Sequence, residues 1–377
     1  MKTGKILLMT CIPLAVVGGA FCARETEQLL LREAFRENFL IGAALNDDVV
    51  SGKDPRAAAI VAKQFNTITA ENAMKWVWIH PAPNTYDFGP ADRFVEFGEK
   101  NAMWIVGHAL VWHSQIPDWA FEDDAGGLLT RNAMLARLKD HIGSVVGRYK
   151  GRVRAWDVVN EALTDEGGIR NSKWKQTIGE DFIAKAFEYA HQADPDAELY
   201  YNDFSLDKPA KREACVNLVK DLKARGLRVD GVGIQGHWGM DYPTTDNLEA
   251  FIIATGALGV KVMVTEMDLD ILPTAWEYEG ADVSKRVALQ VGLNPYVDGL
   301  PPVMEKKLTD RYVELFSVLC KHSDKVDRVT FWGVYDKTSW LNNWPVRGRT
   351  SYPLLFARDY QPKPAFYAVL GAVEKKK

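Results

Sequence analysis

Hydrophobic residues in this chain gather in short runs that are continuous rather than alternating with polar residues. Eight such runs, rich in β-branched and aromatic side chains, begin at residues 39, 65, 103, 153, 198, 229, 260 and 328. Continuous hydrophobicity over such lengths indicates strands that are covered on both faces, as the strands of a parallel sheet are.

Segments with helical spacing lie between these runs, because their apolar residues recur three or four positions apart. Two of them comprise Phe182, Ile183, Ala186, Phe187 and Ala190, and Leu308, Tyr312, Leu315, Phe316 and Leu319. Another helix is expected after Asp207, which would cap it, with Pro209 in its first turn.

Eight strands that alternate with helices predict an α/β fold, a (β/α)8 TIM barrel in a single domain. An open doubly wound sheet is the alternative, but no Gly-rich phosphate-binding turn follows the first run. The stretch from about Pro273 to Pro302 is longer than a strand–helix connection needs. We expect it to be an elaborated loop on the rim of the barrel.

Residues 1–22 have the layout of a signal peptide, with two lysines, an apolar run from Ile6 to about Val17 and then small residues. A buried N-terminal helix is the alternative. We therefore expect the folded domain to occupy residues 23–377 and the protein to be secreted or periplasmic. It would be held at a membrane only if Cys22 is lipidated.

The overall composition is that of a soluble globular protein, with 47% hydrophobic and 25% charged residues. A net charge of -4 and a pI near 6.0 argue against nucleic acid as the main partner. Beyond the signal peptide only Cys215 and Cys320 remain, too few for a disulfide framework, and Cys215 is expected to be a buried thiol. The 12 tryptophans are more informative, because some of their rings could face a ligand.

Polar residues follow the predicted strands, and the carboxyl ends of barrel strands share one face. In chain order they are Asn46; Glu71, Asn72 and Lys75; His108, Trp112 and His113; Asn160 and Glu161; Tyr201, Asn202 and Asp203; Gln235 and His237; Glu266 and Asp268; and Trp332, Asp336 and Trp340. A bowl of amides, carboxylates and indole rings matches a sugar, whose hydroxyls hydrogen-bond and whose C–H faces stack on aromatic rings.

Glu161 and Glu266 end the fourth and seventh apolar strands abruptly. Cleavage of a glycosidic bond needs two such groups, one to protonate the leaving oxygen and one to attack or to activate water. Repulsion between the two charges would help to separate these roles. For either glutamate alone, a salt bridge to a neighbouring helix is an equal alternative.

The histidines do not form a recognisable metal motif, since the chain contains no HExxH and no His-x-His after the first run. No metal and no cofactor are therefore expected. His80 and His191 are expected on the surface or on helices, whereas His108, His113 and His237 are expected to act as neutral hydrogen-bonding groups.

Seven motifs in order resemble those of the glycoside hydrolase family 10 endo-1,4-β-xylanases, over residues of about 35 to 370. They are "TAENAMKW" (69–76), "GHALVWHSQ" (107–115), "WDVVNEA" (156–162), "YYNDF" (200–204), "GIQGHW" (233–238), "VTEMDL" (264–269) and "WGVYDKTSW" (332–340). Ala109, where the family usually has Thr, and Met267, where Leu is common, depart from the pattern and are expected to affect packing alone.

The resemblance implies a retaining endo-1,4-β-xylanase, with Glu161 as the acid/base and Glu266 as the nucleophile. Asn160 would hold the 2-hydroxyl of the sugar being cleaved. His237 would hydrogen-bond Glu266, with Asp268 fixing the ring. The expected sugar contacts on the non-reducing side of the cut are Glu71, Asn72, Lys75, His108 and Trp112, and those that close over the sugar are Gln235, Trp332 and Trp340.

The expected partner is thus a polysaccharide, xylan or its oligosaccharides, acted on by a monomer for which the sequence reveals no protein partner. Three other hypotheses remain open at this stage. The chain could cleave cellulose or mixed glucan, bind oligosaccharides without turnover, or be a metal-dependent barrel hydrolase.

Overall fold

The computed structural model describes residues 30–275 and 285–374. The signal peptide predicted for residues 1–22 lies outside this range.

Parallel strands form a closed barrel, which confirms the predicted fold. The sheet order is β6-β5-β4-β3-β2-β1-β9-β8, the pairing of β6 with β8 closes the ring, and the short β7 adds to β8. The strands are β1 (Leu40–Leu45), β2 (Thr67–Ala70), β3 (Trp104–Val111), β4 (Ala155–Asn160), β5 (Glu198–Asp203), β6 (Gly231–Ile234), β7 (His237–Gly239), β8 (Lys261–Asp270) and β9 (Val326–Phe331).

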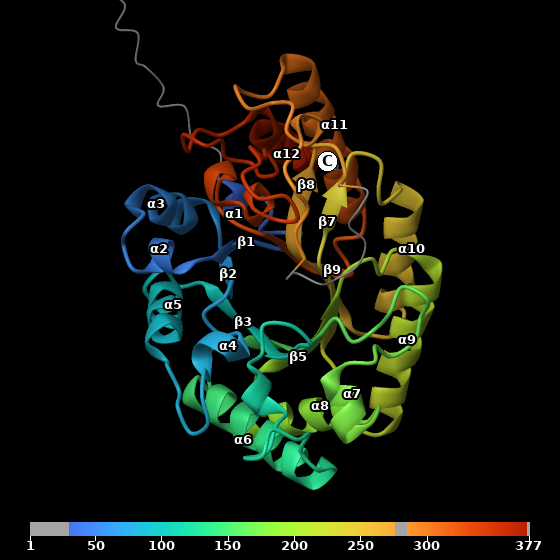
Figure 1. Ribbon diagram of the computed structural model, residues 1–377. Helices are drawn as coiled ribbons and strands as arrows, with labels where there is room; N and C mark the ends of the chain where they lie inside the picture. The colour runs from blue at the N-terminus through green and yellow to red at the C-terminus, as the bar shows by residue number, and fades with distance from the viewer. Residues whose placement is uncertain (1–29, 276–284, 375–377) are drawn as a thin grey trace, which may run out of the picture.

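Helices surround the barrel, and Figure 1 shows the strands in the centre with the helices around them. They are α1 (Leu31–Ala34), α2 (Asp47–Val50), α3 (Pro55–Gln64), α4 (Trp76–Ile79), α5 (Gly89–Lys100), α6 (Arg131–Arg148), α7 (Lys173–Ile178), α8 (Phe182–Ala193), α9 (Pro209–Ala224), α10 (Thr245–Gly256), α11 (Pro302–Lys321) and α12 (Pro364–Glu374). Short 3-10 turns are η1 (Asp118–Ala120), η2 (Val291–Leu293), η3 (Asp336–Thr338) and η4 (Trp340–Asn342).

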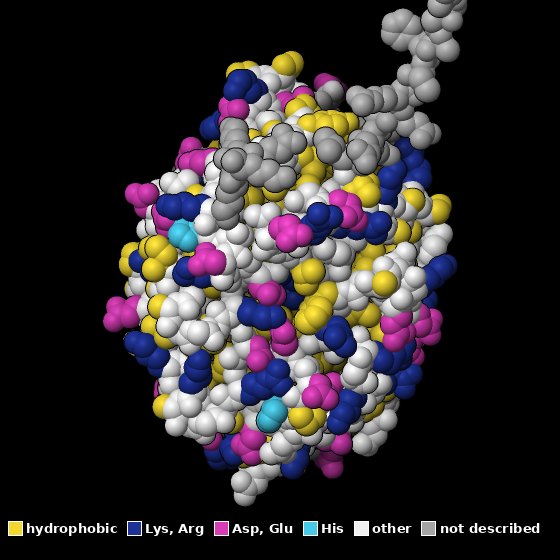
Figure 2. All heavy atoms as spheres, turned by 180° about the vertical axis from the view of Figure 1, so that it is seen from behind, with side chains coloured by type: hydrophobic (Ala, Val, Ile, Leu, Met, Phe, Trp, Pro, Cys, Tyr) yellow, Lys and Arg dark blue, Asp and Glu magenta, His cyan; other side chains and the backbone are white. Residues whose placement is uncertain are grey.

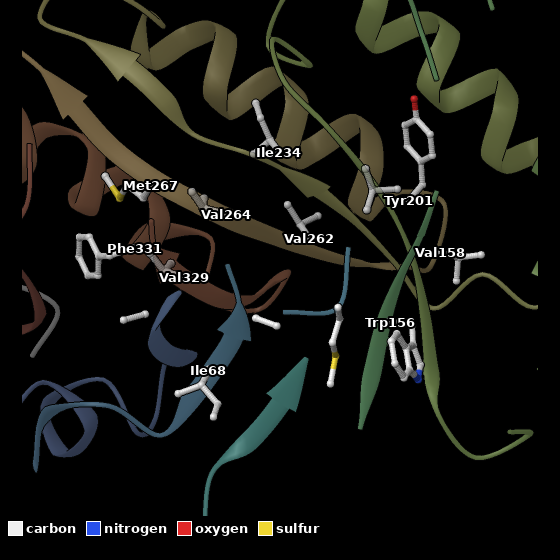
Figure 3. Packing of buried hydrophobic residues seen from close by; sticks show 14 of the residues in the cluster. Ile68, Trp156, Val158, Tyr201, Ile234, Val262, Val264, Met267, Val329 and Phe331 are labelled. Atoms are coloured by element: carbon white, nitrogen blue, oxygen red, sulfur yellow. The ribbon is translucent and has the colours of Figure 1, made fainter. Parts of the chain in front are cut away.

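The main hydrophobic core lies between the strands and the helices. Figure 3 shows part of it, with Ile68, Val264 and Val329 projecting from three different strands. A smaller cluster comprises Val106, Ala155, Tyr200 and Met263. Each strand therefore buries both of its faces, which explains why its hydrophobic residues run continuously instead of alternating.

The predicted helical faces are also buried. In α8 the buried residues include Phe182, Ile183 and Phe187, and in α11 they include Leu308 and Leu315. One detail was wrong: α9 begins with Pro209 at its first turn as expected, but its N-cap is Lys208, with no side-chain cap, rather than Asp207.

The loop predicted between Pro273 and Pro302 is confirmed in its described parts, and α11 begins at Pro302. From residue 285 onward this loop contacts the segment that follows β9. Val287 forms a parallel bridge with Val346, and the hydroxyl of Tyr352 donates to the carbonyl of Tyr296 at 2.5 Å. Residues 276–284 lie outside the description.

Cys215 and Cys320 are both buried and form no disulfide. None of the helices in the described ranges is long and apolar enough to cross a bilayer. On the face shown in Figure 2, acidic and basic side chains lie interspersed rather than in patches of one sign.

Candidate active site

The polar residues predicted at strand ends meet at one end of the barrel. Glu161 directly follows β4, Glu266 lies within β8, and both are buried. The ladders shift register near both residues, between Asp157 and Val159 on β4 and between Val264 and Met267 on β8. Such bulges bend a strand and re-aim its side chains, and they are common beside active sites.

An unbroken chain of side-chain amides joins the two glutamates. Gln235 Nε2 lies 2.8 Å from Glu161 Oε1 and 3.3 Å from the side-chain amide of Asn160. Asn202 Nδ2 lies 3.0 Å from the same Asn160 amide and donates to Glu266 Oε1 at 2.8 Å. The two carboxyl groups are therefore joined by one set of amides. The ion pairs found for them among the described residues are with His113 and His237, which do not lie on helices, so the alternative of a salt bridge to a neighbouring helix does not apply.

Asn202 is itself fixed by its neighbours. Its carboxamide oxygen accepts a hydrogen bond from the Thr265 hydroxyl at 2.6 Å, so its nitrogen must point toward Glu266. A Cβ at Gly233 would lie 2.5 Å from that oxygen. Glycine is required here because a side chain would displace the amide that holds Glu266.

Glu266 accepts a second hydrogen bond from His237, whose Nε2 lies 3.2 Å from Oε2. Burial alone would raise the pKa of Glu266. The hydrogen bond from His237 and nearby cationic groups, Lys75 among them, outweigh burial and hold its pKa below the ordinary value. Glu266 is therefore an ionised carboxylate at neutral pH.

His237 lies between two acids, because its Nδ1 is 3.0 Å from Asp268 Oδ1. Burial would lower the pKa of His237, but Asp268 and Glu266 favour the protonated ring and raise its pKa to about 10. The expected contacts of His237 with both acids are confirmed. The expectation of a neutral ring was wrong for this histidine, because two carboxylates stabilise its charge.

Glu161 has an unusual backbone conformation, with φ at +57°. For a residue other than glycine, this left-handed region costs about 1–3 kcal/mol and persists only where the surroundings enforce it. One carboxylate oxygen, Oε1, is held by Gln235, and no group in the described ranges hydrogen-bonds the other, Oε2. This second oxygen is buried, and His113 Nδ1 lies 3.9 Å from it.

Glu71, Asn72 and Lys75 form a polar group beyond β2. Asn72 Nδ2 lies 3.3 Å from Glu71 Oε1, and Lys75 Nζ donates to Asn72 Oδ1 at 3.1 Å. Burial raises the pKa of Glu71 and lowers that of Lys75, each opposed by the charge of the other. The Lys75 ammonium lies 5.1 Å from the ring centroid of Trp112 and 5.8 Å from that of Trp332, and the charges of Glu266 and Glu161 also act on it, so it belongs to the same group of residues.

Aromatic and histidine rings pack around these polar residues. Trp332 meets His108 edge-on at a centroid distance of 5.4 Å, and His108 Nδ1 is 2.9 Å from Asp157 Oδ2. Trp340 stacks on Trp344 with centroids 4.6 Å apart and donates its indole N–H to Asp268. The structure thus brings together all twelve predicted site residues: Glu71, Asn72, Lys75, His108, Trp112, Asn160, Glu161, Gln235, His237, Glu266, Trp332 and Trp340.

Three supporting residues were absent from the predicted site. Asn202 was noted at a strand end but not assigned a contact, and the motif "YYNDF" could have indicated it. Asp157 lies inside a run that reads as hydrophobic. Arg170 lies nine residues after Glu161 in a loop and carries no periodic signal, although its guanidinium contacts the Glu161 carbonyl.

The placement of His80 on the surface was wrong. Its ring is buried in a stack with Tyr86 at 3.9 Å, and its Nδ1 faces His141 Nδ1 at 3.1 Å. His141 in turn lies flat against Trp76 at 3.6 Å. Within residues 30–275 and 285–374, no three His, Cys, Asp or Glu side chains are arranged to hold a metal ion.

Comparison with known proteins gives a consistent result. The chain matches the family described as Glycosyl hydrolase family 10 over residues 30–372. It is 44% identical over 368 residues to "Endo-1,4-beta-xylanase A" of Xylanibacter ruminicola, covering 98% of this chain and 99% of that protein. It is also 44% identical to "Beta-1,4-xylanase" of Dictyoglomus thermophilum, covering 90% of each.

Among solved structures, a GH10 endoxylanase retrieved from a sugarcane soil metagenome aligns with a TM-score of 0.87. It is 45% identical, and the alignment covers 90% of this chain and 99% of that one. The xylanase XynB of Paenibacillus barcinonensis aligns with a TM-score of 0.83 at 38% identity, covering 92% of this chain and 99% of the other.

Proposed function

The chain belongs to glycosyl hydrolase family 10, and we propose that it is an endo-1,4-β-xylanase that cleaves internal bonds of xylan with retention of configuration. The observation that carries this proposal is that the amides of Gln235, Asn160 and Asn202 join Glu161 and Glu266 at one end of the barrel. The names of the similar proteins supply the substrate class.

In the first step, a carboxylate oxygen of Glu266 attacks the anomeric carbon. The Glu161 carboxyl group gives its proton to the glycosidic oxygen, so the bond between that oxygen and the anomeric carbon breaks and the shortened chain leaves. The lowered pKa of Glu266 supports its role as the nucleophile, because only the ionised form can attack.

In the second step, water attacks the same carbon of the glycosyl ester. Glu161 accepts the proton of that water, the ester bond breaks, and Glu266 leaves as a carboxylate. Glu161 Oε2 accepts no hydrogen bond from the described residues, so no neighbouring donor competes for the proton that this oxygen would give and later take.

The other residues would bind the sugar. Asn160 would contact the 2-hydroxyl, while Glu71, Asn72, Lys75, His108 and Trp112 would hold the non-reducing side. Gln235, Trp332 and Trp340 would close over the ring. Buried amides and charges set among indole rings suit a hydroxyl-rich ligand with apolar faces.

The test is to incubate the mature protein with xylan and to measure new reducing ends, alongside Glu266→Ala. We expect internal cleavage by the wild type and background rates for the variant. Parallel assays on cellulose and mixed glucan decide the substrate, and tight binding without turnover would replace the proposal by a sugar-binding role. Loss of activity on chelation would favour the metal-dependent alternative.

We further propose that the protein acts as a monomer outside the cytoplasm, after removal of residues 1–22. The pattern of lysines, apolar run and small residues supports export. Sequencing the N-terminus of the protein recovered from the medium, periplasm and membranes tests this, and a lipid on Cys22 would place it at a membrane. Sedimentation tests the oligomeric state.

A further inference from the structure

The left-handed turn at Glu161 must be held by its neighbours, because its own backbone disfavours it. On one side, the Glu161 N–H donates to the carbonyl of Asn202 at 2.9 Å, which ties it to β5. On the other side, the Glu161 carbonyl accepts from Arg170 Nε at 3.0 Å. Arg170 is therefore attached directly to the main chain of this glutamate.

Arg170 also closes the loop that follows Glu161. Its Nη2 donates to the carbonyl of Leu163 at 3.1 Å, and its own N–H donates to the carbonyl of Ala162 at 2.7 Å. A bridge between Leu163 and Ile169 completes a small hairpin. Three consecutive residues, 161–163, are thus bonded to one arginine.

The guanidinium group suits this task because it is planar and can donate to two carbonyls in fixed directions. Its centre lies 6.0 Å from the centroid of the Phe204 ring, which follows β5. The side chain is therefore held from two sides, and its described contacts are carbonyl oxygens and a ring rather than a carboxylate. A charge role in substrate binding does not explain these contacts.

We propose that Arg170 is a positioning residue for Glu161. By binding the carbonyls of Glu161 and Leu163, it keeps the main chain in the left-handed turn that directs the Glu161 carboxyl group at the glycosidic oxygen. The inference rests on the proposed function, in which Glu161 is the acid/base. It assigns no contact with the sugar to Arg170.

A misplaced acid has an effect that depends on the leaving group. General acid catalysis contributes roughly 10²–10⁴-fold, and a substrate that leaves readily without a proton does not need it. We therefore expect Arg170→Ala to lower kcat/KM for xylo-oligosaccharides about 10- to 100-fold, a part of that contribution. Release of dinitrophenolate from a dinitrophenyl xylobioside in the first turnover should change little.

Azide gives a second readout, because it attacks the glycosyl ester without needing a base to remove a proton. Steady-state turnover of the dinitrophenyl substrate by Arg170→Ala should therefore rise when azide is added, with a glycosyl azide as product, while that of the wild type should not. Arg170→Lys keeps the charge and one donor and should give intermediate values. If Arg170→Ala fails to fold, the same measurements are made on Arg170→Lys.

Arg137→Ala is the matched control, since Arg137 also donates to two loop carbonyls, those of Trp119 and Glu122, but contacts neither glutamate. Any change in the rate should be the same for the xylo-oligosaccharides and for the dinitrophenyl xylobioside. Equal losses on both substrates for the Arg170 variants, with no response to azide, would overturn the proposal. Inactivity of the wild type on xylan would instead refute the proposed function, so the two failures are distinguishable.

Discussion

Trp340 donates its indole N–H to Asp268 Oδ2 at 2.7 Å, while the other oxygen of Asp268 holds His237. The indole ring of Trp340 is thus connected, through Asp268 and His237, to Glu266. Trp340, which would cover the sugar, and Glu266, which would attack it, therefore belong to one hydrogen-bonded network.

Trp340→Phe tests this connection, because it keeps an aromatic face and removes the donor. A lost hydrogen bond to a charged group is worth about 1.5–3 kcal/mol, so kcat should fall roughly 10- to 150-fold. Steady-state kinetics on xylohexaose measure it. Trp78→Phe, at a ring 58% exposed on α4, is the control and should leave kcat unchanged. A change confined to KM would mean that Trp340 acts by stacking alone.

His237→Asn should shift the pH profile. The protonated ring helps to hold the pKa of Glu266 down, so its loss should raise that pKa and move the acidic limb of kcat/KM to higher pH. The rate at the optimum should also fall, by roughly 10- to 150-fold for one lost charged hydrogen bond. An acidic limb that stays in place would show that other groups control the ionisation of Glu266.

The same histidine should affect stability at alkaline pH. Its pKa is raised from 6.5 to about 10 on folding, so its stabilising effect is complete below pH 6.5 and is lost as the pH rises through 10. The difference in unfolding free energy between wild type and His237→Asn should therefore shrink across this window. Urea unfolding at several pH values measures it, and a constant difference would contradict the raised pKa.

The buried pair His80 and His141 should destabilise the fold in acid. Burial lowers the pKa of His80 to about 4, with Asp140 opposing and Arg137 reinforcing the shift, and burial also lowers that of His141. Below pH 6.5 these histidines bind protons in the unfolded chain but stay neutral in the fold. The free energy of unfolding is therefore highest above pH 6.5 and falls as the pH falls toward 4.

Replacing both histidines of this pair by Phe removes donor and acceptor together, which costs little at neutral pH. The double variant should lose less stability than the wild type between pH 6.5 and 4, as measured by thermal unfolding. His191→Gln, at an exposed position on α8, is the control and should follow the wild type. If the unfolding temperatures of all three proteins fell equally with pH, this explanation would be wrong.

Lys211→Met should destabilise the protein strongly. Lys211 and Asp203 form a fully buried ion pair at 2.8 Å, and Asp203 also accepts from the Leu163 N–H, two residues after Glu161. Removing one partner of such a pair leaves a buried charge and costs about 3–5 kcal/mol. Lys208→Met removes a half-exposed partner of Asp165 and should cost about 0–1 kcal/mol. Denaturant titration compares the unfolding free energies of the two variants. Similar losses in both would mean that water reaches Asp203.

The sequence was sufficient for the barrel and for the polar residues that meet at one end of it. Strands such as β4 are marked by continuous hydrophobicity, and their ends by abrupt polar residues such as Glu161. Periodicity carries this information because burial on both faces of a strand restricts every position in it.

Side-chain partners could not be predicted in the same way. His80 follows an apolar turn and precedes a proline, and nothing local reveals that His141, 61 residues away, lies beside it. The charge of His237 likewise depends on the β7–β8 pairing, which places this histidine beside Glu266 and Asp268, two acids of β8. Contacts between distant segments are decided by the fold, so they are absent from local patterns.

The closed ring also constrains how this chain can be made. Leu40, in the first strand, pairs with Arg328, in the last. A ribosome must therefore release nearly the whole polypeptide before the first strand meets its final neighbour. Until then two strand edges stay unpaired, so the nascent chain is most open to aggregation late in its synthesis.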